Sequence, residues 1–268
     1  VGLHLCCHQV GLVIHFTKAP EFRKCSTVLL VGAAEHCMPL LPVRLPRPLL
    51  VGLDVDGTLA GTNVVFPYAA ARLRELPRAV RIPWGVLFLL RCAIFLLVDA
   101  INRSLFQRLF YRCYRGRDAS AAAKARLGEA AFDDYIRPRL FPRALQHVRF
   151  LQAQGFEIVL VTGGLDFVAR KVGEALGASH VVAAELEEEG GRFTGRLRGK
   201  PVSDAEKGRR IRAYAAVRGL NLDRCHAYGD SRADLGMLEA VGRPHAVSPS
   251  RSLQRLAAQK GWPVLEWE

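Results

Sequence analysis

Residues 49–59 read LLVGLDVDGTL, an apolar run that ends in two carboxylates one residue apart. Such a run, closed by a glycine turn, predicts a buried strand. Because side chains alternate along a strand, Asp54 and Asp56 point the same way at its carboxyl end, where open α/β sheets bind ligands. Two carboxylates there can act as nucleophile and general acid–base, with a cation relieving their repulsion. The alternative is a capped turn after a core strand, with no chemistry.

Three later segments also place polar side chains in the pattern of a phosphate site. The apolar run 158–161 ends in Thr162-Gly163-Gly164, whose hydroxyl and glycine-turn N–H groups suit a phosphate. Lys207 follows in a helical pattern, and residues 225–228 then lead into Gly229-Asp230-Ser231-Arg232-Ala233-Asp234. Each segment is a weak signal alone, but their order predicts one site at the carboxyl ends of neighbouring strands.

Strand and helix patterns alternate along the chain from residue 49 onward. Strands are predicted at 49–55, 157–162, 180–184, 224–229 and 244–248. Helices are predicted at 142–154, 165–176, 203–218, 232–240 and 250–259. The alternation predicts an α/β fold with a Rossmann-like, mainly parallel sheet and helices on both faces. Residues 185–197 predict a hairpin, and residues 261–263 precede a short edge strand.

The ordered segments resemble the motifs of the haloacid dehalogenase superfamily of phosphatases. The matching residues are Asp54-Val55-Asp56-Gly57-Thr58, Thr162-Gly163-Gly164, Lys207, and Gly229-Asp230-Ser231 with Asp234. The insert between the first two motifs is similar in position to the helical cap of the phosphoserine phosphatase-like subfamily. The resemblance implies a catalytic core from 49–59 and 142–268 and an inserted helical cap over 60–141. The composition of residues 1–48 predicts a poorly ordered leader and linker before the core.

This resemblance implies a Mg²⁺-dependent phosphomonoester hydrolase that acts through an aspartyl-phosphate. Asp54 would attack phosphorus, and Asp56 would protonate the leaving alkoxide and then deprotonate the hydrolytic water. The other implied roles are phosphate binding by Thr162, Gly163 and Lys207, metal binding by Asp54, the Asp56 carbonyl and Asp230, and support by Thr58 and Asp234. The alternative function is a phosphate-binding module that docks on membranes without turnover, and the intact aspartate pair argues against it.

The substrate alternatives are an apolar or lipid-linked phosphomonoester and a small metabolite such as phosphoserine. In phosphoserine phosphatases a glutamate shortly after the first motif recognises the substrate amine, but Asn63 stands at the matching position here. Ala233 likewise replaces an asparagine of that subfamily. The segment Phe66-Pro67-Tyr68, followed by an apolar cap, also resembles the phosphatase-like domain of plant glycerol-3-phosphate acyltransferases.

The positive charge of the chain is concentrated in the insert. The whole chain carries a net charge of +13, and residues 60–141 contribute +8 of it. A basic surface can attract an anionic membrane, an anionic substrate or nucleic acid, or it can simply be a solvated face. Nucleic acid is the least favoured partner, because no nucleic-acid-binding motif is visible.

The stretch 82–101 is almost entirely apolar, with Arg91 and Asp99 as its charged residues. Its length would allow a transmembrane helix, but a single crossing would separate Asp54 from Thr162 on opposite sides of the bilayer. Three interpretations therefore remain: a buried cap helix, a membrane-surface or re-entrant hairpin, and one member of a paired span.

Seven cysteines, an odd number, show no disulfide pattern and indicate a reducing compartment. We therefore expect a cytoplasmic protein, with membrane association through the cap as an extension. The cysteines and histidines among residues 1–48 invite a zinc interpretation, but their spacing fits no paired-ligand pattern and favours an unstructured leader. The sequence does not indicate an oligomeric state.

Overall fold

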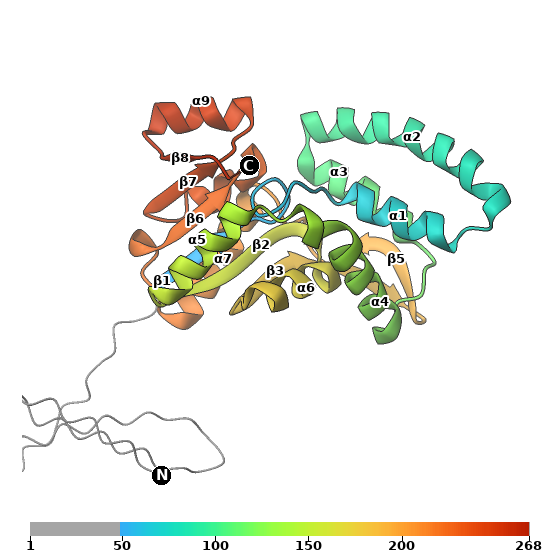
Figure 1. Ribbon diagram of the computed structural model, residues 1–268, viewed down its shortest axis with the longest axis horizontal. Helices are drawn as coiled ribbons and strands as arrows, with labels where there is room; N and C mark the ends of the chain where they lie inside the picture. Colours follow the sequence, from blue (N-terminus) through green and yellow to red (C-terminus); the bar gives the residue numbers. More distant parts are fainter. Residues whose placement is uncertain (1–48, 268) are drawn as a thin grey trace, which may run out of the picture. The chain divides into compact units, whose positions relative to one another are not determined.

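The computed structural model describes residues 49–267, which form a six-stranded parallel sheet with helices around it (Figure 1). The strands are β1 (Leu49–Leu53), β2 (Phe156–Leu165), β3 (His180–Ala184), β6 (His226–Gly229), β7 (Arg243–Val247) and β8 (Val264–Leu265). The predicted α/β fold is confirmed. The predicted leader, with its cysteines and histidines, lies outside the described residues.

The strand order is β3-β2-β1-β6-β7-β8, and every neighbouring pair is parallel. β1 lies between β2 and β6, with Leu53 paired to Leu160 on one side and to Tyr228 on the other. The chain therefore builds outward in both directions from β1. Ligands of such sheets bind outside the carboxyl ends of the strands at this switch point.

Helices cover both faces of the sheet, as the alternation of strand side chains requires. Val51, Leu53 and Leu160 point into one buried cluster, and Leu50 and Val159 point into the other. The helices on the first face are α5 (Pro142–Ala153) and α6 (Asp166–Leu176). Those on the second face are α7 (Ala205–Arg218), α8 (Leu235–Leu238) and α9 (Arg251–Lys260).

Most predicted boundaries lie within two residues of the observed ones, with two corrections. β2 continues to Leu165, so Thr162-Gly163-Gly164 forms an irregular strand end with a register shift against β3, and the predicted helix-opening glycine turn is wrong. The single helix predicted over 232–240 is also wrong. A 3₁₀ turn (Arg232–Asp234) precedes the short α8, because Ser231 and Asp234 close a capping box around it.

The insert leaves and rejoins the sheet through two paired linkers. The Gly61 N–H donates to the Arg139 carbonyl at 3.0 Å, and the Phe141 N–H donates to the Leu59 carbonyl at 3.0 Å. Between them lie α1 (Val65–Glu75), α2 (Arg78–Ile101), α3 (Arg103–Phe110) and α4 (Ala121–Ala131). Figure 1 shows these helices to one side of the sheet, and we call residues 60–141 the cap.

The cap also packs against a two-stranded hairpin of β4 (Leu186–Glu189) and β5 (Arg192–Leu197), at the place where the sequence predicted a hairpin. The ring of Phe193 lies edge-on to Tyr114 at 6.2 Å and stacks on Phe167 at 6.1 Å. The Gly116 N–H donates to the Phe193 carbonyl at 2.8 Å. The hairpin therefore supports the cap from the side of α6.

The long helix α2 forms the outer layer of the cap, and its backbone contacts run mainly to α3. Phe88 is the buried side chain of this helix, whereas Ile82 is 79% exposed and Leu90 and Leu97 are each 64% exposed. The interpretation of residues 82–101 as a buried cap helix is therefore wrong. Among the described residues, α2 is the one helix long and apolar enough to cross a membrane.

Candidate functional site

The site is built where β1, β2 and β6 end. Asp54 follows β1, Thr162 lies in the last part of β2, and Asp230 follows β6. Parallel strands end at the same edge of a sheet, so side chains from distant segments meet there. Lys207, from the first turn of α7, reaches the same place.

Lys207 holds two carboxylates together in the interior. Its side chain is 3% exposed, and its Nζ donates to Asp54 Oδ1 at 2.5 Å and to Asp234 Oδ1 at 2.6 Å. The other oxygen of Asp234 accepts from the Ser231 N–H and from the Ser231 hydroxyl, each at 3.1 Å. Asp234 is thus fully engaged by protein donors, and it positions Lys207 beside Asp54.

Carboxylate oxygens of Asp54, Asp230 and Asp234 lie within 4.8 Å of one another. Gly57 allows this approach, because a Cβ there would lie 2.5 Å from Asp230 Oδ2. The turn also needs the glycine for its backbone, whose φ is +84°. The Thr58 hydroxyl lies 3.4 Å from Asp230 Oδ1, at the long limit for a hydrogen bond.

Burial, with added repulsion between the carboxylates, disfavours their full ionisation. Burial raises the pKa of Asp54 to about 7 despite the neighbouring Lys207 charge. Burial, together with the charges of Asp234 and Asp54, raises the pKa of Asp230 to about 9. Burial alone would lower the pKa of Lys207, but the two aspartates raise it overall. An all-oxygen cluster with excess negative charge fits Mg²⁺, which would remove this repulsion.

Asp56 lies apart from the Lys207 pair and faces the start of the cap. The Thr62 hydroxyl donates to Asp56 Oδ1 at 2.7 Å, which fixes the orientation of the carboxyl group. Burial raises the pKa of Asp56, while the Thr62 hydrogen bond and the Arg103 charge oppose that rise. A buried carboxyl group with a raised pKa is suited to proton transfer.

The end of β2 presents a hydroxyl and open backbone to the same space. The Thr162 hydroxyl accepts from the Gly164 N–H at 3.0 Å, and the Tyr111 hydroxyl donates to the Gly163 carbonyl at 2.5 Å. A Cβ on Gly163 would lie 2.1 Å from Gln107 Nε2. Any larger residue at position 163 would therefore force the Gln107 side chain of the cap helix α3 to move.

Three residues of α3 that the sequence analysis did not single out also line the site: Arg103, Phe106 and Gln107. Arg103 donates to Asp99 at 2.5 Å and lies 5.7 Å above the Phe106 ring. Gln107 is 3% exposed, and its Oε1 has no hydrogen-bond partner among residues 49–267. The positive charge of the cap was visible in the sequence, but no pattern indicated which cap residues reach the aspartates.

The cavity enclosed by these residues has a volume of about 20 Å³. That is room for about one water molecule. A larger molecule could enter only if the residues around this cavity, which come from both the cap and the core, moved apart. The paired linkers at Gly61 and Phe141 are the covalent connections about which such a movement can occur.

Comparison with known proteins identifies a family and several relatives. A family model described as haloacid dehalogenase-like hydrolase matches residues 51–239. A Streptomyces azureus protein named for inhibition of morphological differentiation is 39% identical over 135 residues, which are 50% of this chain and 48% of that protein. A histidinol-phosphatase of Neisseria meningitidis is 30% identical over 192 residues, 64% of this chain and 86% of that enzyme. Several further relatives are named phosphatase or phosphoserine phosphatase, and this chain spans about half their length.

A solved phosphoserine phosphatase, crystallised as an analogue of its phospho-aspartyl intermediate, has the same fold. The TM-score is 0.59 at 20% identity, over 83% of this chain and 95% of that one. At this identity the likeness shows the fold and does not transfer a substrate. The family match over 51–239 agrees with the parallel sheet and with the placement of the four motifs. The chain belongs to the haloacid dehalogenase-like hydrolase family.

Proposed function

We propose that this protein is a Mg²⁺-dependent phosphomonoester hydrolase in which Asp54 is the nucleophile. The observation that carries this proposal is the buried hydrogen bond of 2.5 Å between Lys207 Nζ and Asp54 Oδ1, at the edge of an acidic cluster. A lysine held by Asp234 can balance the charge of a transferring phosphoryl group. A binding module without turnover has no need of a buried, oriented nucleophile of this kind.

In the proposed reaction, an Asp54 oxygen forms a bond to phosphorus while the bond from phosphorus to the leaving oxygen breaks. Asp56 gives its proton to the leaving alkoxide. Asp56 then accepts a proton from water, whose oxygen attacks the aspartyl-phosphate and releases inorganic phosphate with Asp54 restored. Thr162 and Gly163 would hold the phosphoryl oxygens from the end of β2.

Asp54, Asp230 and the Asp56 carbonyl are the proposed ligands of Mg²⁺. The bound ion would supply charge stabilisation for the phosphoryl oxygens. Asp234 is proposed as a positioning residue, because both of its oxygens already accept hydrogen bonds from Lys207 and Ser231. Thr58 is proposed to orient Asp230.

The residues that line the site favour a phosphomonoester without an amine beside the phosphate. The described carboxylates that line the cavity are Asp54, Asp56 and Asp234, and all three have proposed catalytic or positioning roles. Asn63, at the position expected to recognise an amine, accepts from the Val65 and Phe66 N–H groups at 3.0 and 3.2 Å, so its side-chain oxygen is occupied by the first turn of α1. We therefore rank phosphoserine below an apolar phosphomonoester.

The proposal is tested by hydrolysis of para-nitrophenyl phosphate with and without Mg²⁺. We expect turnover that is lost with EDTA and restored by Mg²⁺ but not by Ca²⁺, which accepts looser geometry and more ligands. Activity that is unaffected by EDTA, or absent at saturating Mg²⁺ with the fold intact, would rule out the proposed mechanism.

We further propose that the cap brings this enzyme to anionic membrane surfaces. The face of α2 opposite its partner helices carries exposed apolar side chains: Ile82, Val86, Leu90, Ile94, Leu97 and Ile101. A helix with one apolar face and basic neighbours is typical of proteins that lie in the membrane interface.

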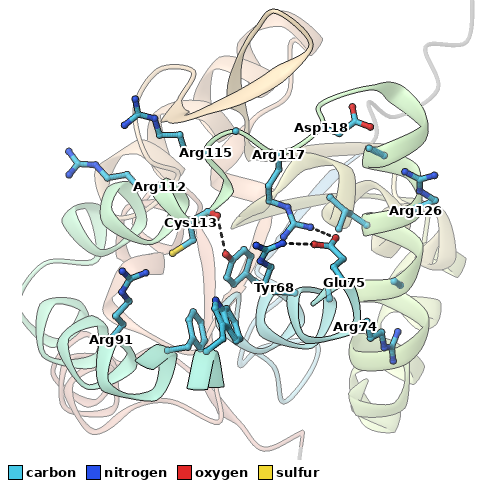
Figure 2. Close-up of a pocket in the computed structure, with 18 residues that line it drawn as sticks. Tyr68, Arg74, Glu75, Arg91, Arg112, Cys113, Arg115, Arg117, Asp118 and Arg126 are labelled. Carbon is cyan, nitrogen blue, oxygen red and sulfur yellow. Dashed lines mark hydrogen bonds and ion pairs between the residues drawn. The ribbon is translucent and has the colours of Figure 1, made fainter. Parts of the chain in front are cut away.

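A pocket of about 920 Å³ beside α2 supplies the basic side chains (Figure 2). Figure 2 shows Arg91, Arg112 and Arg115 along one side of this pocket, away from the ion pair between Arg117 and Glu75. Within the part of the chain that the structure describes, these three arginines form no ion pair. Unpaired arginines next to an exposed apolar helix suit anionic lipid headgroups.

A further inference from the structure

A second hollow lies in the cap, between α1 and α2, with a volume of about 510 Å³. We call it the cap groove. Its walls are mostly apolar and include Phe66, Ala69, Phe88, Leu89, Phe95 and Leu96. Leu89 and Leu96 are 68% and 72% exposed, so the groove opens to the surface along this edge of α2. An apolar hollow of this size on a cap is large enough to hold an extended hydrocarbon chain.

The cap groove adjoins the catalytic cavity. Val64, Arg103 and Phe106 line both spaces. From this junction the groove extends along α2 between Asp99 and Gly85, fourteen residues apart, which is roughly 21 Å of helix. If the shared wall residues move apart when a phosphate enters beside Asp54, the rest of the molecule faces the end of the groove.

The polar groups of the groove are gathered at the end nearest the phosphate. Asn63 is occupied by the backbone of α1, and Asp99 Oδ2 accepts from Arg103 at 2.5 Å. Asp99 Oδ1 has no hydrogen-bond partner among the described residues. Beyond this junction the walls offer no charge, so the groove suits a ligand that is polar at its phosphate end and apolar along the rest.

We propose that the cap groove binds the hydrocarbon chain of the substrate, which makes the preferred substrates single-chain alkyl or acyl phosphomonoesters. This inference rests on the proposed phosphatase function and assigns its substrate class. Burial of each methylene group favours binding by up to about fourfold. Arg103, at the junction, separates the phosphate site from the apolar walls.

The test is a chain-length series of alkyl phosphates, from butyl to tetradecyl, below their micellar concentrations and without membranes. We expect kcat/KM to rise at least tenfold from butyl to octyl phosphate, as several methylene groups enter the groove. Para-nitrophenyl phosphate, whose ring is too short to extend along the groove, serves as the reference for basal turnover. A flat chain-length series from an enzyme that hydrolyses the reference substrate would overturn the inference and leave the proposed function intact.

Gly85 is the site for a variant that blocks the groove. It lines the groove, and a Cβ there would meet nothing within 4 Å. We expect Gly85→Phe to end the rise in kcat/KM at a shorter chain than in the wild type, because its ring would fill the far end of the groove, and to keep turnover of the reference substrate. Gly85→Ala controls for the loss of glycine, and Val86→Phe places the same ring on the outer face of the same helix. Both controls should keep the full rise of kcat/KM with chain length. If Val86→Phe reduces this rise as much as Gly85→Phe does, the assignment of the groove is contradicted.

A second measurement does not depend on turnover. Alkylphosphonates of the same lengths cannot be hydrolysed, and their binding to the full chain with Mg²⁺ can be followed by calorimetry. We expect the affinity of the wild type to rise with chain length. In Leu73→Ala the rise should be smaller, because Leu73 lines the distal part of the groove. Affinity that is independent of chain length would overturn the groove assignment even if no phosphatase activity were found.

Discussion

Lys207 Nζ lies 2.5 Å from Asp54 Oδ1, although 153 positions separate the two residues in the chain. The contact joins the end of β1 to the start of α7 inside the protein, where both side chains are almost fully buried. A buried ion pair of this kind is costly to desolvate and is a weak source of stability by itself. The ion pair between Lys207 and Asp54 is better explained by the proposed reaction of the Asp54 carboxylate.

The first prediction concerns Asp54, the proposed nucleophile. Asp54→Asn removes the attacking oxygen charge but keeps the side-chain shape, so we expect para-nitrophenyl phosphate turnover to fall at least a thousandfold with the fold retained. Circular dichroism checks the fold. Asp223→Asn, at an exposed position, is the matched control and should keep full activity. Residual activity within tenfold of the parent would exclude the aspartyl-phosphate mechanism.

Lys207→Met tests the energetic role of the lysine. The substitution leaves Asp54 and Asp234 buried without their cation, and removing one partner of a buried pair costs about 3–5 kcal/mol. We expect a lower urea midpoint as well as lost activity. Lys260→Met breaks the pair with Glu239 at the surface and should change stability by less than about 1 kcal/mol. Equal midpoints for the two variants would show that the buried pair does not matter for folding.

Gly57→Ala separates backbone strain from crowding at the proposed metal site. Both Gly57 and Gly155 have positive φ, at +84° and +82°, but a Cβ meets Asp230 at the first and open space at the second. Each Ala variant should lose about 1–2 kcal/mol of stability. We expect only Gly57→Ala to need at least tenfold more Mg²⁺ for half-maximal activity. The same Mg²⁺ requirement in both variants would argue against Asp230 as a ligand.

The membrane proposal predicts binding to vesicles that contain phosphatidylserine and weaker binding at high salt. Leu90→Glu with Leu97→Glu places two charges on the exposed face of α2 and should reduce co-sedimentation at least tenfold without unfolding the cap. Phe150→Glu with Val217→Glu, two exposed apolar positions outside the cap, is the matched double variant and should bind like the parent. Wild-type protein that binds no vesicles of any composition would end this proposal.

A stack of aromatic rings at β6 and β7 predicts acid sensitivity. His245 lies 4.5 Å from the ring of Tyr228, and burial, with the charges of His226, His147 and Arg243, lowers the pKa of His245 to about 4. An unfolded histidine titrates near 6.5, so the unfolded chain binds a proton that the native state does not. Stability should therefore fall as the pH drops from about 6.5 to about 4.

His245→Phe should make this loss shallower by about 1 kcal/mol per pH unit. The measurement is the free energy of unfolding in urea between pH 7 and pH 5. Tyr228→Phe, in the same stack, removes no imidazole and should keep the parent slope while its absolute stability changes. If the free energy of unfolding of His245→Phe changes with pH as steeply as that of the parent, the acid sensitivity arises from other residues.

The core could be predicted from the sequence because its signals are local. The apolar run before Asp54 and the glycines after it belong to one continuous segment, and the structure forms β1 there. The grouping of Asp54, Lys207 and Asp230 followed from parallel topology, which brings strand ends to one edge. The turn at residues 232–234 was not predicted, because a capping box and a helix start share the same residue types.

The cap could not be predicted to the same depth. Hydropathy is the same for a buried helix and for one that faces outward, so the exposure of α2 depends on whether other helices cover it. Arg103 and Gln107 reach the site through the packing of α3 against the end of β2, a contact without any spacing rule in sequence. Residues that act across an insertion are therefore the ones that sequence patterns miss.

The paired linkers have a consequence for how such enzymes diversify. Gly61 and Phe141 lie at the two ends of the cap, and hydrogen bonds to Arg139 and Leu59 hold these ends side by side. An insertion with adjacent ends can be exchanged or lengthened without moving the strands that carry the aspartates. We expect a chimera with the cap of a relative to keep its catalytic chemistry and to acquire that relative's preference for leaving groups. Substitution or replacement of this one inserted segment can thus change the substrate while the core keeps its residues.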